Sequence, residues 1–282
     1  MREIARELIA ERVAGACREA NLVLPLDVRR ALEHAAQTDS NARAREILAD
    51  ILRNADLSPE TGLPLCQDCG LVVVFAEVGQ DARITGGTLA DAIDDGIRGG
   101  YEAGYLRKSM LANPLDRASN TGDNTPAVVH VTLVQGDGLK LVVAPKGGGC
   151  ENMSAVWMLT PSQGRQGIID AVVARIQEAG GRPCPPLILG VGVGGSFEHA
   201  AVIAKKAAIV RTVGEPHADP ELAQLEADLL AAVNATGVGP MGLRGDTTAL
   251  AVHVESSPCH IASLPVAMNV QCHSARHKTV EL

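Results

Sequence analysis

The chain has 282 residues, and 46% of them are hydrophobic, so it has the material for a large apolar core. Aromatic residues make up only 2% and the formal net charge is −8, which argues against the basic, base-stacking surface of a nucleic-acid-binding protein. No uninterrupted apolar run reaches the ~18 residues of a membrane span, and the first residues are amphipathic rather than a leader peptide. We therefore expect a cytoplasmic protein with no membrane and no nucleic-acid partner, whose seven cysteines are thiols or metal ligands.

The N-terminal part of the chain is predicted to be helical. Apolar residues recur three and four positions apart over residues 2–20 and roughly 27–55, the spacing of amphipathic helices. Turn-forming residues from Ser58 to Pro64 break the pattern. We interpret residues 1–57 as a helical segment packed on a single catalytic domain that covers residues 1–282.

Helices and strands alternate in the rest of the chain. Residue patterns predict strands over 71–78, 127–134, 140–144, 187–193, 248–255 and 264–270. They predict helices over 88–110, 162–179, 197–209 and 219–235. The first of these helices carries glycines along one side, which would let another element approach closely. The turn at residues 135–138 favours an antiparallel hairpin, and Asp219-Pro220 is typical of a helix start.

The predicted fold class is therefore α/β, with mixed sheets, flanking helices and a helical N-terminus. Glycine-bearing and cysteine-bearing loops fall at the ends of the predicted strands, and we expect them to form one site.

Three cysteines lie far apart in the sequence, each in a turn-rich segment. The segments are Pro-Leu-Cys66-Gln-Asp, Gly-Arg-Pro-Cys184-Pro-Pro and Asn-Val-Gln-Cys272-His-Ser. Three thiolates brought together hold a [4Fe–4S] cluster and leave one iron without a protein ligand, and such an iron is a Lewis acid for oxygen groups. Cys66 and Cys69 also form a C-x-x-C motif, so a redox dithiol, half of a zinc site or a buried structural pair are alternatives.

Two glycine-rich segments suggest contacts with an anion. Lys146-Gly147-Gly148-Gly149 is not a P-loop, because its lysine precedes the glycines, but its bare amides allow a close approach. Residues 190–195 fit the G-x-G-x-x-G pattern of dinucleotide binding, which makes a nucleotide-dependent oxidoreductase one alternative. The motif comes late in the chain, and Glu215 lies in a turn rather than at a strand end. A tight strand-to-helix turn is the plainer interpretation.

Taken in order, several segments resemble one family over nearly the whole chain: the α subunits of two-subunit class I fumarate hydratases, which are iron–sulfur hydro-lyases. Tartrate dehydratase α subunits are close relatives of this family. The segments that carry the resemblance are Pro64–Asp68, Leu106–Met110, Asn120–Ala127, Pro145–Gly149, Cys184–Pro186 and Gly239–Leu243.

The resemblance implies a site and a partner. It implies that Cys66, Cys184 and Cys272 hold a [4Fe–4S] cluster, and that Asp68 is the acid–base aspartate. The remaining residues that it places against the substrate are Gln67, Arg107, the amides of Gly148 and Gly149, and His260. In the family, a second half supplies a threonine base and further basic contacts. The resemblance therefore implies a separate β subunit, in an α2β2-type heteromer.

The implied reaction interconverts malate and fumarate, a step of the tricarboxylic acid cycle. Cys69 stands where the family usually has threonine, and Cys150 stands where fumarases usually have serine and tartrate dehydratases also have cysteine. An α subunit of a tartrate or other C4–C5 hydroxy-diacid dehydratase is therefore the second interpretation. The segments at 106–110 and 120–126 look more like fumarase and carry more weight, because they include Arg107. A non-catalytic scaffold subunit that holds a cluster or zinc is the third. We predict that Cys69 and Cys150 are not ligands.

Overall fold

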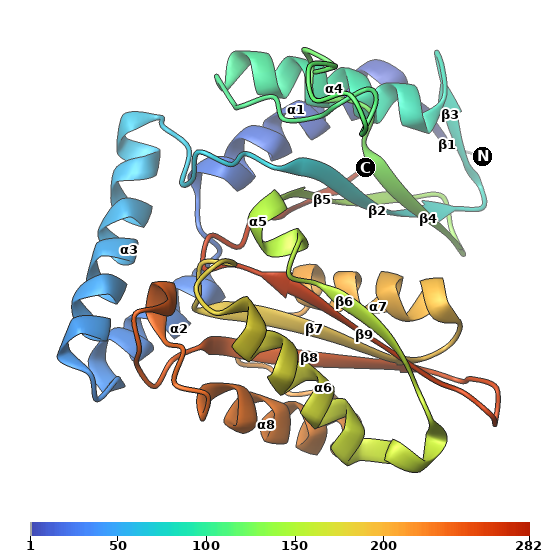
Figure 1. The fold of residues 1–282 in the computed structure, drawn as a ribbon. Coiled ribbons are helices and arrows are strands. Elements are labelled where there is room, and N and C mark those ends of the chain that lie inside the picture. The colour runs from blue at the N-terminus through green and yellow to red at the C-terminus, as the bar shows by residue number, and fades with distance from the viewer. Residues whose placement is uncertain (1) are drawn as a thin grey trace. The chain divides into compact units, whose positions relative to one another are not determined.

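The computed structural model describes residues 2–282 and groups the chain into two compact units, each assembled from separate segments (Figure 1). The first unit comprises the residues up to Leu24, Ala55–Gly148 and Arg276–Leu282. The second unit comprises Pro25–Asn54 and Gly149–Ala275. A single catalytic domain over residues 1–282 stays a prediction.

The first unit is built on a four-stranded mixed sheet with the order β10-β5-β2-β4. Its strands are β2 (Leu71–Gly79), β4 (Val128–Val134), β5 (Leu139–Lys146) and β10 (Lys278–Glu281). Strand β2 runs parallel to β4 and antiparallel to β5. A separate pair of short parallel strands joins β1 (Arg2–Ala5) to β3 (Ala82–Thr85).

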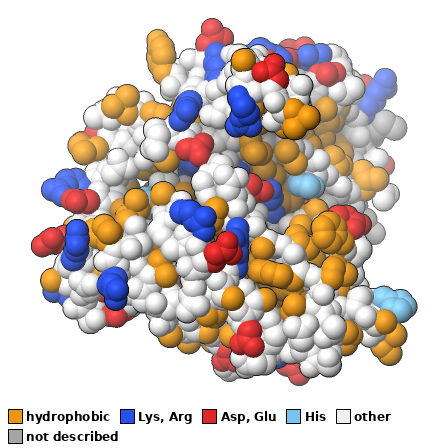
Figure 2. Space-filling model, in the orientation of Figure 1, with side chains coloured by type: hydrophobic (Ala, Val, Ile, Leu, Met, Phe, Trp, Pro, Cys, Tyr) orange, Lys and Arg blue, Asp and Glu red, His pale blue; other side chains and the backbone are white. Residues whose placement is uncertain are grey.

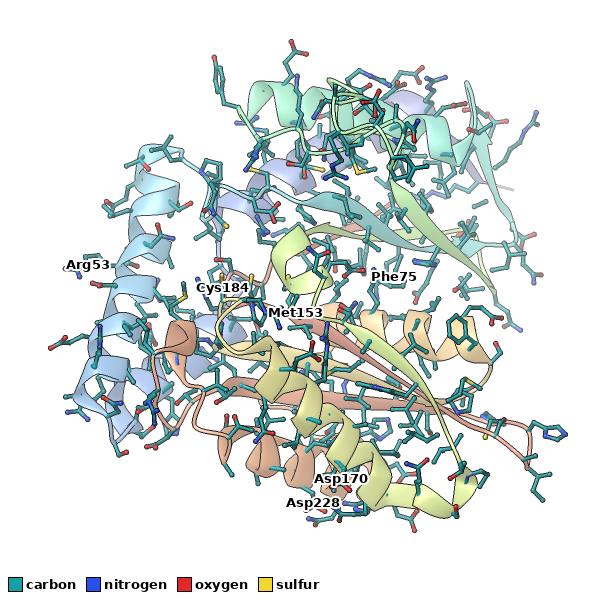
Figure 3. All side chains as sticks on the ribbon, viewed as in Figure 1. Arg53, Phe75, Met153, Asp170, Cys184 and Asp228 are labelled. Carbon is teal, nitrogen blue, oxygen red and sulfur yellow. The ribbon has the colours of Figure 1, made fainter. Side chains whose placement is uncertain are left out.

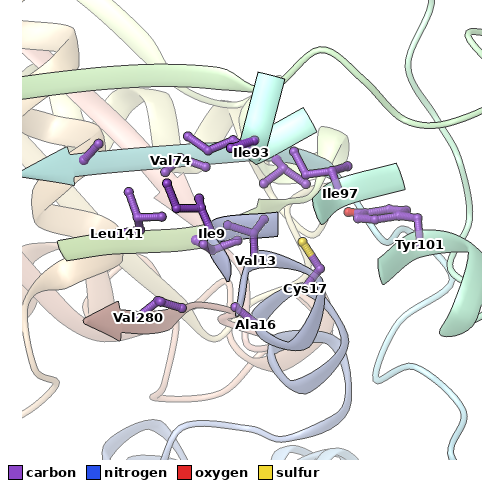
Figure 4. Close-up of a cluster of buried hydrophobic side chains, with 14 of the residues drawn as sticks. Ile9, Val13, Ala16, Cys17, Val74, Ile93, Ile97, Tyr101, Leu141 and Val280 are labelled. Atoms are coloured by element: carbon purple, nitrogen blue, oxygen red, sulfur yellow. The ribbon is translucent and has the colours of Figure 1, made fainter. Parts of the chain in front are cut away.

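Helices α1 (Arg6–Leu22) and α4 (Leu89–Ala103) bury their apolar faces on this sheet, and Figure 4 shows the resulting core. Ile9 and Val13 of α1 and Ile93 of α4 are fully buried there. The two helices touch closely: a Cβ on Gly96 would lie 2.6 Å from the Ala10 carbonyl oxygen, and one on Gly100 would lie 2.8 Å from that of Ala14. The close approach predicted from the glycines of this helix is therefore confirmed.

The predicted hairpin between residues 127 and 144 is wrong. Both strands exist, but β2 lies between them and pairs with each. Their connection crosses the end of β2 at Gly79, whose N–H donates to the Gly138 carbonyl at 2.8 Å. A Cβ on Gly79 would lie 2.4 Å from the Gly136 carbonyl oxygen, so this crossing requires glycine. The turn residues predicted a reversal of the chain correctly, but they contain no information about a third strand between the two.

The second unit contains a four-stranded mixed sheet with the order β6-β9-β7-β8. Its strands are β6 (Ala155–Leu159), β7 (Leu187–Gly194), β8 (Ala249–Ser257) and β9 (Leu264–Gln271). Helix α7 (Phe197–Val210) covers one face, while α6 (Gly164–Ala179) and α8 (Pro220–Asn234) cover the other (Figure 1). The remaining helices of the chain are α2 (Leu26–Thr38), α3 (Ala42–Thr61) and the single turn α5 (Gly148–Glu151), with short 3₁₀ turns at Pro161–Gln163 and Pro240–Gly242.

The glycines of the G-x-G-x-x-G motif serve the packing of α7 on β7. A Cβ on Gly190 would lie 1.9 Å from the Ala204 carbonyl oxygen, and one on Gly192 would lie 2.2 Å from that of Ala200. Gly194 and Gly195 then turn the chain into α7 with φ angles of 88° and 71°. Close helix–strand packing and a tight turn account for all four glycines, so the motif needs no nucleotide to explain it.

The N-terminal helices differ in detail from the prediction. Residues 2–5 form a strand instead of a helical turn, because they pair with β3. The predicted helix over 27–55 is two helices, interrupted at Asp39, which is only 2% exposed. Its carboxylate accepts the N–H groups of Asn41, Asp246 and Thr247, which a continuous helix would not allow. Most other boundaries shift by a few residues, but α4 ends at Ala103, seven residues before the predicted end at 110.

The surface is of mixed charge. Figure 2 shows basic and acidic side chains interspersed over the face in view. Within residues 2–282, no helix combines the length and the apolar character required to cross a membrane.

Candidate active site

In the first unit, residues 66–70 form a turn between α3 and β2 that carries three of the predicted site residues. Cys66 and Asp68 are half-buried and Gln67 is exposed. The Asp68 N–H donates to the Cys66 sulfur at 3.4 Å. The turn ends at Gly70, which has a φ of 75° and lies so close to Lys146 that a Cβ would be 2.6 Å from its backbone.

The Asp68 carboxylate is held by backbone amides on both oxygens. Oδ2 accepts the N–H of Gly148 at 2.7 Å, and Oδ1 accepts the N–H of Gly70 at 3.0 Å. The sheet explains the first contact, because Leu71 pairs with Lys146, so the start of β2 lies beside the end of β5. The structure therefore brings together Asp68 and Gly148, which the sequence placed 80 residues apart.

Three buried polar side chains bind the backbone carbonyls of this turn, and we call Tyr101, Asn124 and Arg276 the turn supports. The Tyr101 hydroxyl donates to the Cys69 carbonyl at 2.6 Å, and the Asn124 side chain donates to the Gly70 carbonyl at 3.1 Å. Arg276 donates to the Asp68 carbonyl at 2.5 Å. None of the three is more than 1% exposed.

Asn124 also connects the turn to the segment that carries Arg107. Its Oδ1 accepts the N–H of Ser109 at 2.7 Å, while the Arg107 side chain itself is exposed. The neighbouring Asp123 accepts hydrogen bonds from Thr125 and Arg98. Desolvation opposes the ionisation of Asp123, but these hydrogen bonds outweigh it and lower its pKa to about 2. The polar segment 120–125 thus holds the Arg107 loop against the Asp68 turn.

None of the seven cysteines forms a disulfide, which agrees with the prediction of thiols or metal ligands, but their surroundings differ. Cys69 is 1% exposed, and burial raises the pKa of its thiol, partly offset by a hydrogen bond from the backbone of Arg107. Cys150 is 3% exposed, and its sulfur lies 3.9 Å from Oε1 of Gln271. Cys66, Cys184 and Cys272 are all half-buried. Partial exposure separates the three predicted ligands from Cys69 and Cys150.

In the second unit, Cys184 and Cys272 lie at the same end of the sheet. Cys184 is on the turn before β7 (Figure 3), and Cys272 directly follows β9, which is antiparallel to β7. The Cys184 carbonyl accepts the backbone N–H of His273 at 3.4 Å and lies 2.9 Å from its ring nitrogen Nδ1. Gly149 of α5 lies close by, because its Cβ position is 3.7 Å from the Arg182 carbonyl oxygen.

The Gly239–Leu243 segment supports the Cys184 turn. The Met241 N–H donates to the Pro185 carbonyl at 2.8 Å. A Cβ on Gly242 would lie 2.4 Å from the Cα of Gly181, so the two chain segments touch through glycines. Cys184 itself has a φ of 57°, a conformation that this close packing holds in place.

His260 lies at the opposite end of the same sheet. It follows β8, which runs parallel to β7, so it lies beyond the strand ends where Gly194 pairs with Ser257. The length of β7 separates it from Cys184, which at the usual rise per residue is roughly 25 Å. The His260 ring is exposed and accepts the N–H of Ala262 at Nδ1. The structure therefore does not bring His260 to the two cysteines of its own unit.

The predicted site residues are divided between the two units. Cys66, Gln67, Asp68, Arg107 and Gly148 belong to the first unit, and Gly149, Cys184, His260 and Cys272 belong to the second. Within residues 2–282, no group of three or more His, Cys, Asp or Glu side chains is arranged to hold a metal ion.

The sequence did not identify the turn supports. Asn124 falls in a segment that carried the family resemblance, but nothing in its spacing gave it a role. Tyr101 continues the apolar face of its helix and looks like an ordinary core residue. Arg276 lies four residues after Cys272, and that proximity was the one available signal.

Comparison with known proteins places the chain in a family. The fumarate hydratase (Fumerase) family matches residues 10–281. The chain belongs to the fumarate hydratase family. It is therefore a hydro-lyase, and the resemblance seen in its sequence motifs is confirmed.

Similar proteins carry a related name. A protein of Methanocaldococcus jannaschii named "Putative L(+)-tartrate dehydratase subunit alpha" is 40% identical over 273 residues, which cover 95% of each chain. The L(+)-tartrate dehydratase subunit alpha of Escherichia coli strain K12 is 29% identical over 259 residues, 91% of this chain and 85% of its own. That of Escherichia coli strain UTI89 is 29% identical over 261 residues, 92% of this chain and 86% of its own.

Proposed function

We propose that this chain is the α subunit of an iron–sulfur hydro-lyase that interconverts malate and fumarate in the cytoplasm. The observation that carries the proposal is the Asp68 carboxylate, which accepts the Gly148 amide at 2.7 Å and follows the half-buried Cys66 and the exposed Gln67 in the chain. An acid–base carboxylate, an anion-binding glycine turn and a thiol thus occupy one small region of the first unit.

The donor set fits a cluster with three protein ligands. Cys66, Cys184 and Cys272 are half-buried and form no disulfide, and the Cys66 sulfur accepts a backbone N–H, as cluster cysteines commonly do. When bound, a [4Fe–4S] cluster with three thiolate ligands supplies one open iron, a Lewis acid for the departing hydroxyl group.

The residues of the chain supply binding and proton transfer. Arg107 has an exposed guanidinium on a loop fixed by Asn124, so it is free to bind a substrate carboxylate bidentately. In this proposal the amides of Gly148 and Gly149 also contact the dianion, with the Gly148 N–H shared with the Asp68 carboxylate, and the exposed Gln67, which precedes Asp68 in the chain, contacts it too. Asp68 transfers a proton to or from the hydroxyl group of the substrate. The amides of Gly148 and Gly70 orient its carboxylate for this step.

His260 contacts substrate, in this proposal, only when it comes from another polypeptide chain. It lies at the far end of the sheet from Cys184 and Cys272 of its own unit. Substitution of His260 by Asn should therefore be rescued in mixed complexes with a Cys184→Ser chain, each copy supplying what the other lacks. Absence of any rescue would refute this assignment.

A separate β subunit supplies the base that removes the carbon-bound proton. The similar proteins are named as α subunits, which supports a partner of this kind. We propose an α2β2-type assembly, measured by mass determination of the co-expressed complex.

The second candidate substrate is tartrate, favoured by the names of the similar proteins. Cys150, the position that raised this alternative, is 3% exposed, so it does not touch a substrate directly. Side-by-side assays of the αβ complex with malate, fumarate, L(+)-tartrate and mesaconate distinguish these substrates. We expect the highest kcat/KM with malate and fumarate.

The decisive test is anaerobic purification with the β partner, followed by iron, sulfide and fumarate-hydration assays. An active complex with no iron and no sulfide would refute the proposal. Asp68→Asn should assemble normally and lose turnover, whereas Asp137→Asn, in the exposed 135–138 turn, should not change it. Full turnover in Asp68→Asn would instead favour a non-catalytic scaffold subunit.

The cluster assignment makes two further claims. Air should inactivate the enzyme, because an iron without a protein ligand is open to oxidants. Serine at Cys69 or Cys150 should leave the iron content near normal, while serine at Cys66, Cys184 or Cys272 should remove it. Activity unchanged by prolonged aeration contradicts the first claim, and loss of iron in the Cys69 or Cys150 variant contradicts the second.

A further inference from the structure

Arg276 is a buried cation whose hydrogen-bond acceptors are both neutral. Its Nη1 donates to the Asp68 carbonyl at 2.5 Å and to Oδ1 of Asn21 at 3.1 Å, and its Nε is buried without a partner. The side chain is 1% exposed and Asn21 is fully buried. Among residues 2–282, no carboxylate lies within ion-pair distance of this guanidinium.

Such a charge is costly to bury. A guanidinium removed from water loses hydration that neutral acceptors only partly replace, and buried arginines are normally paired with carboxylates. Arg6 and Arg98 show the ordinary case in the same unit, since both form ion pairs with Asp95 near the surface. For hydrogen bonding to a carbonyl alone, a neutral glutamine would serve, so the charge of Arg276 has a separate role.

The charge lies directly behind the turn that carries Cys66 and Asp68. Arg276 holds the Asp68 backbone, and its Nη2 lies 3.2 Å from the Cβ position of Gly147, with Oδ2 of Asp68 at 3.3 Å from the same point. The positive charge of Arg276 also acts on Cys69 and Tyr101. Burial raises the pKa of both side chains, and the charge of Arg276 lowers each pKa by a smaller amount. Thiolate ligand, Asp68 carboxylate and dianionic substrate would all be negative groups in front of it.

We propose that Arg276 is a positioning residue that holds the Cys66–Asp68 turn and supplies the positive charge behind it. The two roles use different properties of the side chain. The two N–H groups of Nη1 join the Asp68 carbonyl to Asn21 of α1, and the positive charge compensates the negative charge of the Cys66 thiolate. The inference rests on the proposed function, because it takes Cys66 as a cluster ligand.

The reduction potential of the bound cluster is a measure of the charge that Arg276 contributes. Potentials of iron–sulfur clusters depend on nearby net charge, so a neutral residue at position 276 makes the potential more negative. Arg276→Gln removes the charge, and Arg276→Lys keeps the charge on a shorter group that does not reproduce the two Nη1 contacts. Asn21→Asp leaves Arg276 in place and gives it a carboxylate partner of the same size.

The experiment is an anaerobic redox titration of the αβ complex, followed by electron paramagnetic resonance. We expect a shift to more negative potential in Arg276→Gln and Asn21→Asp, and a potential near that of the parent in Arg276→Lys. Turnover of Arg276→Lys should still fall roughly tenfold or more, the usual effect of losing a residue that orients a ligand. Arg12→Gln, at an exposed position of α1, is the matched control and should change neither quantity.

The cluster-free chain gives an independent measurement. Asn21→Asp should raise its thermal midpoint, because the counter-ion gained by the buried guanidinium outweighs the loss of the Asn21 Nδ2 donor to the Cys17 carbonyl. A fall in the midpoint would overturn the claim that Arg276 lacks a counter-ion. Parent-like potentials in both Arg276→Gln and Asn21→Asp would overturn the electrostatic role. If Arg276→Gln does not fold, the two single variants Asn21→Asp and Arg276→Lys are compared instead, and equal potentials in them would overturn it. A parent complex without any cluster would refute the proposed function instead.

Discussion

The two units place their site residues by different physical means. In the first unit, a turn is fixed by the side chains of Tyr101, Asn124 and Arg276, each bonded to a backbone carbonyl of residues 68–70. In the second unit, Cys184 and Cys272 are fixed by strand ends and by glycine contacts between main chains. Hydrogen bonds from buried side chains therefore hold one half of the predicted site, whereas main-chain hydrogen bonds and close glycine contacts hold the other.

The difference predicts which substitutions damage the fold and which damage only the site. Loss of a polar support should change the turn while leaving the rest of the first unit intact. Added volume in the second unit should displace a helix, because close-packed interiors respond to a single added methyl group. The following changes test this contrast, beginning with the largest expected effect.

Gly190→Ala should lower the free energy of unfolding by about 3 kcal/mol, because the new methyl group overlaps the Ala204 carbonyl of α7. Urea denaturation measures this value. Gly99→Ala is the control in the first unit, since no atom lies within 4 Å of its Cβ position, and it should stabilise α4 by up to ~1 kcal/mol. Equal changes in the free energy of unfolding for the two substitutions would contradict the claim that close packing at Gly190 requires glycine.

His253 should make the second unit sensitive to acid. Burial lowers the pKa of its imidazole to about 4, with the charge of Arg211 adding to the effect. The unfolded chain binds this proton more readily, so stability is complete above about pH 6.5 and falls as the pH drops toward 4, by on the order of 2 kcal/mol.

Urea denaturation at several pH values measures this loss. His253→Leu should remove this part of the acid dependence, whereas the exposed His34→Gln should retain it. An unchanged pH dependence in His253→Leu would contradict the assignment.

Tyr101→Phe should cost about 1–2 kcal/mol, because the carbonyls of Cys69 and Gly70 lose a buried donor. We also expect lower turnover in the αβ complex, since the turn that carries Asp68 loses a support. Denaturation and steady-state kinetics measure the two effects. Tyr105→Phe, at a residue that is 94% exposed, is the control and should be silent in both.

Asp219→Ala should have the smallest effect, about 1 kcal/mol, because it removes the N-cap of α8. Its carboxylate accepts the N–H groups of Glu221 and Leu222. Thr88→Ala in the first unit removes a capping box at α4 and should cost a similar amount. Helix caps are local, so a large difference between these two losses would show that the units differ in more than their packing.

The sequence alone determined most of the secondary structure and the family. Periodic apolar residues located α6, α7, α8 and the long strands, and Asp219-Pro220 marked a helix start that the structure confirms. These signals are local, because a residue pattern reports which face of an element is buried. The ordered motifs then identified the family without any knowledge of the fold.

Tertiary structure decided what each buried face and each turn contacts. The placement of β2 between β4 and β5, the packing role of Gly190 and the turn supports all join residues distant in the chain. Arg276 and Asp68 are 208 positions apart, and no periodicity along the chain records such a contact. Local propensity specifies elements, whereas the partner of a buried carbonyl or charge depends on how distant segments pack in three dimensions.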